Sequence, residues 1–463
     1  MAEITTYTTT FNCARQLTNT DFLATSLLSA LTTSALPPDL LVLSLQELAP
    51  ISHSFLGGSL LTPYFSRITE AVALASSRRF GDEDTEAEYV PLITRNVGMT
   101  AMMVFGRHRI AHRVRWVQTA GVGVGEYFEM GNKGAVGVRL GMGIEGSAEE
   151  VVMTFVAAHL APMEEKCARR NEDWRSICEN LVFEAPAEHG GRAGQKKKVA
   201  GAGGEREPLL AGSTEGARDH GQKPSTLFTP PTHLLLSGDL NYRTSDTRPR
   251  ESTNTKTWPQ PVSSPTDANH YSHLLPYDQL IRERTANRTF HNLSEHAIAF
   301  PPTYKYSSAA QAQAVATTTE FHKLADGRTV ERTSIQPAEE KKWLWAGHRT
   351  PSWCDRVLFL AAAKPTVHAY TSLPIQPTSD HRPVALYASF PAQPVEVGVG
   401  EVKEPFALRE DWKQRRVVAR RYEILIGGVA YLLLTWEGRA LIFGTMAGVV
   451  GGYFLLAALV GMH

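Results

Sequence analysis

Acidic, amide and imidazole side chains follow several short apolar runs of the chain, and together these groups can hydrolyse a phosphate ester. The motif SGDLNYR follows one such run and places Asp239 and Asn241 two positions apart, so both side chains can point the same way. One can act as a base and the other as an amide donor. His381 follows a carboxylate in TSDHRP, and Asp355 lies in PSWCDR. Each motif alone is weak evidence, but their combination predicts hydrolysis at phosphorus.

The same segments offer oxygen ligands for a divalent cation and positive charge for an anionic substrate. Glu47 in LQEL is a carboxylate of the kind that hard cations bind. Because these motifs contain no paired cysteines and no clustered histidines, Mg²⁺ is favoured over zinc. Lys133 in GNKGAVG, Lys305 in PTYKY and Arg349 in HRTPSW indicate an anionic substrate.

Short buried strands are the elements predicted to position these residues. Three runs rich in leucine or β-branched residues end abruptly at Glu47, His159 and Asp239, which predicts strands whose ends deliver side chains to one rim. Residues 135–142 have the same apolar character, whereas residues 164–183 repeat apolar positions at helical spacing. We therefore predict an α/β protein with mixed strands and helices.

Composition limits the compartment and the partners. The chain has 463 residues, of which 43% are hydrophobic, enough for a large globular core. Lysine plus arginine equal aspartate plus glutamate at 47 each, so no overall charge draws the protein to nucleic acid. The four cysteines show no paired spacing, and the N-terminus lacks a basic start followed by an apolar run. We therefore expect the catalytic part to lie in the reducing cytosol.

Three polar stretches interrupt the predicted catalytic domain, which we place at residues 1–390. Residues 185–230 are dominated by glycine, alanine and charge, so they are predicted to be a disordered insertion. Residues 244–268 and 307–340 lack apolar periodicity and are predicted to be long surface loops.

The C-terminal part predicts a membrane anchor at residues 424–463. Residues 440–460 contain no charged side chain, and at ~1.5 Å per residue such a helix is about 30 Å long, enough to cross a bilayer. A second apolar run at 424–436 is short for a crossing, so the pair forms either a hairpin or one span with an interfacial helix. Residues 391–423 are interpreted as a basic linker that faces the cytosol and anionic headgroups.

A core hairpin is the alternative interpretation of the same two runs. The anchor interpretation predicts that deleting residues 424–463 leaves the turnover of a water-soluble substrate nearly unchanged, whereas a large loss would show that the tail is part of the fold.

The order and wording of the motifs resemble the inositol polyphosphate 5-phosphatase family of the endonuclease/exonuclease/phosphatase superfamily. The resemblance rests on NKGAVGVRL, AAHLAPMEEKCARRNEDW, LSGDLNYR, PTYKY, PSWCDR and TSDHRPV, and it covers roughly residues 8 to 390. It implies the DNase I-like fold class, an α/β (α+β) sandwich of two β-sheets flanked by helices, with the site at one end. The C-terminal transmembrane helix or hairpin would be added to this domain.

The resemblance implies roles for the acidic and amide residues. Glu47 would ligate Mg²⁺, with Asn12 as a second candidate. Asp239 would orient and deprotonate the attacking water, and Asn241 would hold the phosphoryl oxygens. In-line attack by this water needs no covalent enzyme intermediate.

The two histidines and their partners would stabilise the charge that develops during the attack. By the same resemblance, His159 and His381 would donate hydrogen bonds to the phosphoryl oxygens. Asp355 would fix His381 by accepting its other ring proton, and Asp380 would support either the metal or the histidine.

The resemblance also implies a substrate. In the family, the lysine of PTYKY and the arginine before PSWCDR contact the phosphate next to the one removed, and here these residues are Lys305 and Arg349, with Tyr304 beside them. Asn132 and Lys133 would contact the other end of the headgroup. A phosphoinositide lipid such as a 4,5-bisphosphate is the expected substrate, and a bilayer, more often an endomembrane than the plasma membrane, is the expected partner.

Two departures from the family pattern and two rival functions accompany this interpretation. Phe11 replaces the family's tryptophan, which weakens the assignment of Asn12, and Ala135 replaces a glycine. A membrane-anchored, sphingomyelinase-like phosphodiesterase is one rival, and PTYKY with PSWCDR argues against it. An inactive phosphoinositide-binding tether is the other, and the intact acidic and histidine residues argue against that.

Overall fold

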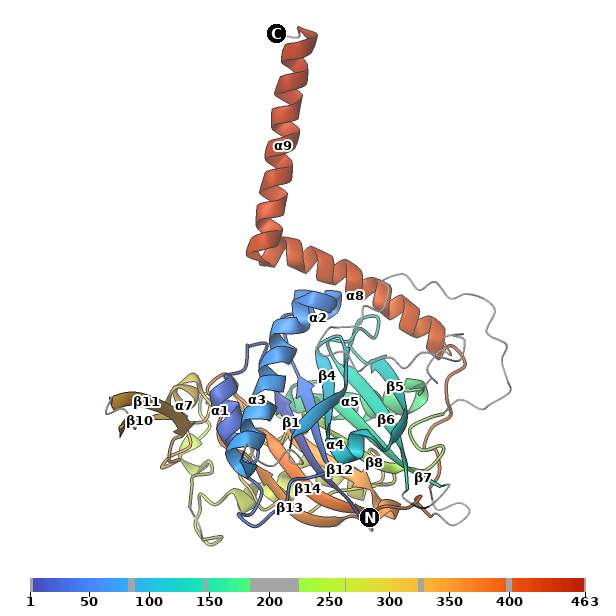
Figure 1. The fold of residues 1–463 in the computed structure, drawn as a ribbon, viewed down its shortest axis with the longest axis vertical. Helices are drawn as coiled ribbons and strands as arrows, with labels where there is room; N and C mark the ends of the chain where they lie inside the picture. The colour runs from blue at the N-terminus through green and yellow to red at the C-terminus, as the bar shows by residue number, and fades with distance from the viewer. Residues whose placement is uncertain are drawn as a thin grey trace.

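The computed structural model describes residues 3–461 except 82–87, 145, 147–148, 184–224, 263, 324–328 and 397–401. Its body consists of two large β-sheets with helices on the outside, and a long C-terminal helix projects away from it (Figure 1). The expected two-sheet α/β sandwich flanked by helices is confirmed.

The first sheet has six strands in the order β13-β14-β1-β2-β4-β3. At its centre β1 and β2 run parallel, and the other neighbours are antiparallel. Every residue of β2 is buried, as expected for a leucine-rich run that is covered on both faces. The strands are β1 (Glu3–Asn12), β2 (Leu40–Gln46), β3 (Tyr89–Val97), β4 (Thr100–Arg107), β13 (Thr366–Ser372) and β14 (Val384–Pro391).

The second sheet also has six strands, in the order β5-β6-β7-β8-β12-β9. Here β7 and β8 form the parallel central pair, and β12 runs antiparallel to β8. The strands are β5 (Val114–Gly123), β6 (Gly134–Gly143), β7 (Glu150–His159), β8 (His233–Asp239), β9 (Leu293–Ser294) and β12 (Asp355–Leu360). The strands predicted to end at Glu47, His159 and Asp239 are therefore β2, β7 and β8, and β2 ends one residue earlier than predicted.

Apolar side chains from both sheets form the main core between them. Val42 and Val104 of the first sheet belong to the same buried cluster as Phe155 and Leu236 of the second. A second cluster fills the space between the other face of the first sheet and two helices, and it includes Leu23, Leu41, Leu43, Ile68 and Val72. The central strands are thus fixed on both faces, which gives rigid support to the residues at their ends.

Helices cover the outer faces and lie in the connections. The helix predicted at 164–183 is α5, which begins at Cys167 after a short 3₁₀ turn and buries Trp174 and Ile177. Side chains of Asn19 and Asp278 cap the first turns of α1 and α6. The helices of the body are α1 (Thr20–Ser26), α2 (Ile51–Leu56), α3 (Thr62–Phe80), α4 (His108–Ala111), α5 (Cys167–Asn180), α6 (Gln279–Thr285) and α7 (Ser308–Gln313).

The polar stretch at 307–340 was expected to be a loop, and this expectation is wrong. It forms α7 and an antiparallel hairpin of β10 (Val315–Lys323) and β11 (Thr329–Pro337) at the side of the body (Figure 1). Threonines supply much of β10, and their β-branched side chains favour a strand although they give no apolar period. Residues 244–268 contain only the 3₁₀ turn Thr255–Thr257 as regular structure among their described positions, which agrees with the predicted loop.

Most of the predicted insertion at 185–230 lies outside the described residues. Its last positions, 225–230, belong to the fold, because Leu227 and Phe228 are only 1% and 2% exposed in the core. The predicted boundary at residue 230 is therefore too late.

Two consecutive helices form the C-terminal part. The first, α8 (Trp412–Leu434), lies along the body, and the second, α9 (Trp436–Val460), leaves it (Figure 1). Within the described part of the chain, only Trp436–Leu459 is long and apolar enough to cross a membrane, and none of its most apolar window is buried. The expected border between a linker and an anchor at residue 423 falls inside α8, so it is not a structural boundary.

Candidate active site

Four neighbouring strands of the second sheet align the residues of the site, because their ends lie in register at one end of the sheet. Gly134 pairs with His159, His159 with Asp239, and Asp239 with Asp355. Lys133 directly precedes this row. The strand pairing of β6, β7, β8 and β12 therefore brings together Lys133 and Asp355, which are 222 positions apart in the sequence.

The central strands of the first sheet end at the same place. Asn12 is the last residue of β1 and pairs with the last residue of β2, so Glu47 follows directly. The Nδ2 atom of Asn12 donates a hydrogen bond of 2.9 Å to Oδ2 of Asp239, which joins the two sheets at the site. The Oδ1 atom of Asn12 accepts from the backbone of Ala14 at 3.0 Å.

Left-handed backbone conformations turn the chain immediately after two of these strands. Glu47 has φ 45° and Asn241 has φ 58°. Such values are uncommon for residues other than glycine, and they cluster where side chains are aimed at a site. The side chain of Asn241 is engaged locally, because its Nδ2 donates to the carbonyl of Leu160 at 3.1 Å and its Oδ1 accepts from Arg243.

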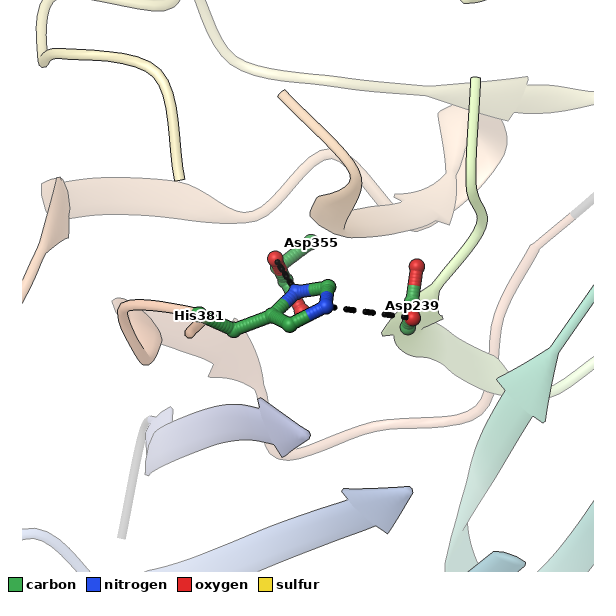
Figure 2. A group of neighbouring side chains, drawn as sticks. All are labelled: Asp239, Asp355 and His381. Atoms are coloured by element: carbon green, nitrogen blue, oxygen red, sulfur yellow. Dashed lines mark hydrogen bonds and ion pairs between the residues drawn. The ribbon is translucent and has the colours of Figure 1, made fainter. Parts of the chain in front are cut away.

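Three buried groups form a chain of contacts across the site, in which Asp239 and Asp355 flank His381 (Figure 2). Nδ1 of His381 lies 2.8 Å from Oδ2 of Asp355, and Nε2 faces Oδ2 of Asp239 at 3.9 Å. The hydroxyl of Thr303 donates to the same Asp355 oxygen at 2.7 Å. This is the pairing of Asp355 with His381 that the sequence predicted.

The charges of His381, Asp355 and Asp239 follow from their burial and from the neighbouring groups. Burial alone would lower the pKa of His381, but Asp355 and Asp239 raise it to about 9, so the ring is protonated at neutral pH. Burial raises the pKa of Asp355, and the charge of His381 opposes that effect. Burial would likewise raise the pKa of Asp239, but His381, His159 and Lys133 lower it far below its usual range.

A second cluster joins Lys133 to Glu47 and His159. The Nζ atom of Lys133 is in close contact with Nε2 of His159 and lies 3.7 Å from Oε1 of Glu47. His159 in turn lies 3.3 Å from Asp239. Burial and the charge of Lys133 lower the pKa of His159, although Asp239 opposes this, so the ring is neutral. Lys133, expected at the far end of the headgroup, thus lies at the centre of the cluster.

The donor set around Glu47 fits a hard divalent cation. Burial would raise the pKa of Glu47, but Lys133, His159 and Arg15 lower it, so the carboxylate is ionised and partly open to solvent. Two cations already face Glu47, Arg15 at 3.1 Å and Lys133 at 3.7 Å, so this position favours positive charge. The trio in Figure 2 is a weaker cation site, because protonated His381 has no free lone pair to offer.

The residues expected to read the substrate surround this centre. The Tyr304 and His381 rings lie 4.5 Å apart between centroids, and Nζ of Lys305 lies 2.7 Å from Oδ2 of Asp380. Arg349 is farther out and donates to Sδ of Met163 at 3.0 Å. Asn132 is adjacent to Lys133, and its Oδ1 is buried without a hydrogen-bond partner in the described structure.

Sequence reasoning missed two charged residues of the site. Arg243 is fully buried and stacks 4.5 Å from the centre of the Tyr304 ring. Glu164 is fully buried 3.9 Å from Arg349, and within the described residues neither of its carboxylate oxygens has a hydrogen-bond partner. Both lie inside quoted motifs, LSGDLNYR and AAHLAPMEEKCARRNEDW, so the motifs marked their position without indicating their role.

Comparison with known proteins identifies several curated relatives of this chain. The chain is 27% identical to type IV inositol polyphosphate 5-phosphatase 3 of Arabidopsis thaliana over 65% of this chain and 34% of that protein. It is 25% identical to inositol-1,4,5-trisphosphate 5-phosphatase 1 of Schizosaccharomyces pombe over 72% of this chain and 22% of the relative. The chain thus spans about a third or less of the length of these curated relatives.

A solved structure has the same fold. The inositol polyphosphate 5-phosphatase domain of SPsynaptojanin, crystallised with inositol (1,4)-bisphosphate and a calcium ion, superposes with a TM-score of 0.53 at 20% identity. The match covers 91% of this chain and 90% of that domain. Residues 9–387 match the family described as endonuclease/exonuclease/phosphatase family 2, most of the chain, and the chain therefore belongs to that family.

Proposed function

We propose that the chain hydrolyses the 5-phosphate of phosphoinositides and of soluble inositol polyphosphates with the same ring phosphates. One observation carries the proposal, namely that Asp239 contacts Asn12 of the other sheet, His159 and His381 at one buried point. The curated relatives named above are inositol polyphosphate 5-phosphatases, which supports the same reaction here.

Asp239 orients the attacking water and accepts its proton in this proposal. The lowered pKa of Asp239 keeps the carboxylate ionised, so it can accept a hydrogen bond from water at neutral pH. Protonated His381 donates from Nε2 to the phosphoryl oxygens as their negative charge grows. His159 lies on the other side of Asp239 and donates to the same phosphoryl oxygens. Asn241 also holds the phosphoryl oxygens, once its Nδ2 leaves its contact with the carbonyl of Leu160.

Glu47 holds Mg²⁺, with Asn12 as the second candidate ligand. The oxygen donors and the absence of thiolates among them favour this ion. When bound, the cation neutralises charge on the phosphate and the leaving oxygen. Asn12 would have to turn its Oδ1 away from Ala14 to contribute, so its present contact with Asp239 favours a role in orienting that carboxylate.

Lys305, Tyr304 and Arg349 read the phosphate next to the one removed. Lys305 is about half-buried and contacts Asp380. The burial and this contact keep its ammonium directed at the site. Asp380 precedes His381 and supports it from the same turn. From its observed position, Lys133 faces the phosphate that is cleaved, and Asn132 is its neighbour in the same turn.

The helix α9 anchors the protein in a membrane, with the catalytic domain in the cytosol and an endomembrane as the favoured location. None of its most apolar window is buried, so a bilayer would cover a surface that the described protein leaves open. An anchored enzyme searches a surface, which raises its effective concentration near lipid substrates. The proposed partners are therefore a phosphoinositide lipid and the bilayer, and nucleic acid is not among them.

Phosphate release tests the proposal. The full-length protein is given phosphoinositides and soluble inositol phosphates with and without a 5-phosphate, and also sphingomyelin, in Mg²⁺ or in EDTA. We expect phosphate only from substrates with a 5-phosphate and only in Mg²⁺. Release of phosphocholine from sphingomyelin would favour the rival phosphodiesterase, and binding of phosphoinositides without turnover would favour the inactive tether.

A further inference from the structure

The turn that carries Asn132 and Lys133 is held from outside the active site. Backbone hydrogen bonds close it, from Val124 to the carbonyl of Lys133 at 2.9 Å and from Gly125 to that of Met130 at 3.2 Å. Gly131 sits too close to a neighbouring loop for any side chain, because a Cβ there would lie 2.8 Å from a backbone nitrogen. The position of Lys133 therefore depends on what holds Gly131.

The helix α8 provides that support. Oε1 of Glu423 accepts a hydrogen bond of 2.8 Å from the backbone nitrogen of Gly131, and Glu423 is only 6% exposed. The rings of Tyr422 and Phe128 stack with centroids 3.9 Å apart. Arg415 of the same helix forms an ion pair with Glu129, which belongs to the turn that carries Lys133. Three positions of the turn, Phe128, Glu129 and Gly131, thus contact one helix close to Lys133.

The same helix also touches the segment that follows Glu47. Arg420 donates to the other Glu423 oxygen at 3.0 Å and to the carbonyl of Phe55 at 2.6 Å. Phe55 belongs to α2, which begins four residues after Glu47. Gly427 lies against it, because a Cβ there would lie 2.8 Å from the Phe55 side chain. The helix therefore holds both chain segments that carry the Glu47 and Lys133 cluster.

The opposite side of α8 is open and mostly apolar, with Arg421 as an exposed charged residue on it. Leu425 lies two positions from both Glu423 and Gly427, about 200° around the helix, and it is 61% exposed. Val418 and Val429 share this outward side and are also exposed. No described part of the chain covers them, and α9 begins just beyond (Figure 1). An exposed apolar side that continues into a candidate membrane span fits a helix lying in a bilayer surface.

We propose that α8 is a positioning helix that lies on the membrane crossed by α9 and holds the Lys133 turn in its active arrangement. Glu423 acts through Gly131 and is a positioning residue. In this arrangement the site faces the bilayer to which the protein is anchored, so the protein acts on headgroups of its own membrane. This inference rests on the proposed 5-phosphatase function and concerns how that site is held.

Glu423 is tested in the full-length protein with a soluble inositol polyphosphate that carries a 5-phosphate. Glu423→Ala removes the acceptor for Gly131 and should lower kcat/KM by roughly tenfold or more. Glu423→Gln keeps an acceptor oxygen and should restore most of that loss. Glu410→Ala is the matched control, because Glu410 is exposed just before α8 and should behave as wild type.

The outcomes separate this inference from the proposed function. A wild-type protein with no 5-phosphatase activity overturns the proposed function. If the wild type is active and Glu423→Ala is equally active, the positioning role is overturned. The same holds if Glu423→Gln is as impaired as Glu423→Ala. If Glu423→Ala does not fold, Tyr422→Ala replaces it, with Tyr422→Phe as the variant that keeps the stacked ring and should retain activity.

The membrane contact is tested separately in vesicles that contain the protein and a phosphoinositide. Leu425→Asp with Val429→Asp should lower the turnover of the vesicle lipid several-fold more than that of the soluble substrate, because a charged face resists contact with the bilayer. An equal effect on both substrates would contradict a membrane-lying α8.

Discussion

Nδ1 of His381 lies 2.8 Å from Asp355, and the opposite nitrogen of the same ring faces Asp239 at 3.9 Å. One carboxylate therefore fixes the ring and keeps it protonated, while the other lies where a water can be held. Because all three groups are buried, their interactions are stronger than at a surface. The charge of His381 is the property on which the first prediction depends.

Asp355→Asn should move the alkaline limit of activity. The raised pKa of His381, about 9, means that the protonated form is present below that pH and is lost above it. Removing the negative charge lowers this pKa toward ~6.5, so the alkaline limb of kcat/KM should shift to lower pH. A pH profile checks this, with Asp267→Asn as an exposed control. An unmoved alkaline limb would show that His381 is not the titrating donor.

Mg²⁺ should stabilise the folded protein through Glu47. A ligand that binds only the folded state raises its stability, by about 2.7 kcal/mol at one hundred times Kd, so the melting temperature should rise by a few degrees. Glu47→Gln should lose most of this rise, whereas Glu70→Gln on the exposed side of α3 should keep it. Thermal unfolding in Mg²⁺ and in EDTA measures the effect, and an equal rise in both variants would place the ion elsewhere.

Lys305→Ala should act on substrate selection more than on turnover. Lys305 contacts Asp380 at 2.7 Å and is available to a phosphate next to the one removed. We expect KM for substrates with that neighbouring phosphate to rise about tenfold to a hundredfold, because a charged hydrogen bond is worth roughly 1.5–3 kcal/mol. Substrates without it should change little. The exposed Lys341→Ala serves as control, and an equal rise for both substrate classes would remove the proposed specificity.

The two C-terminal helices should differ in their effect on the soluble reaction. Deleting residues 436–463 removes α9 alone and should leave the turnover of a water-soluble substrate nearly unchanged. Deleting residues 412–463 also removes α8 and should cause a loss of activity or folding, because Glu423 and Gly427 are buried in the body. Deleting residues 424–463 would divide α8, so this deletion is expected to behave like the deletion of residues 412–463. Equal activity in all three truncations would contradict this division.

The sequence predicted the elements that end at the site more reliably than the contacts between them. The runs before His159 and Asp239 are apolar enough to identify buried strands, and the polar residue at each end marks the rim. The order of the strands in the sheet, which aligns Lys133 with these residues, depends on long-range pairing that local patterns do not encode.

Two errors have different physical reasons. Glu423 and Gly131 are 292 positions apart, so no local pattern could join the predicted basic linker to the active-site turn. The pattern of residues 307–340 does not predict the hairpin of β10 and β11, because its threonines form strands without an apolar period. The residues that carry chemistry were accessible through the family motifs, whereas Glu423, which holds the Lys133 turn, lies outside them.

In the proposed reaction, a water held at Asp239 removes the 5-phosphate. The most direct test of this claim is phosphate release by wild type and Asp239→Asn from two lipids that differ only in that phosphate, phosphatidylinositol 4,5-bisphosphate and phosphatidylinositol 4-phosphate. We predict release by wild type from the bisphosphate alone and a loss of about a hundredfold to ten-thousandfold in the variant. Equal release by the two proteins, or equal release from the two lipids, would contradict the claim.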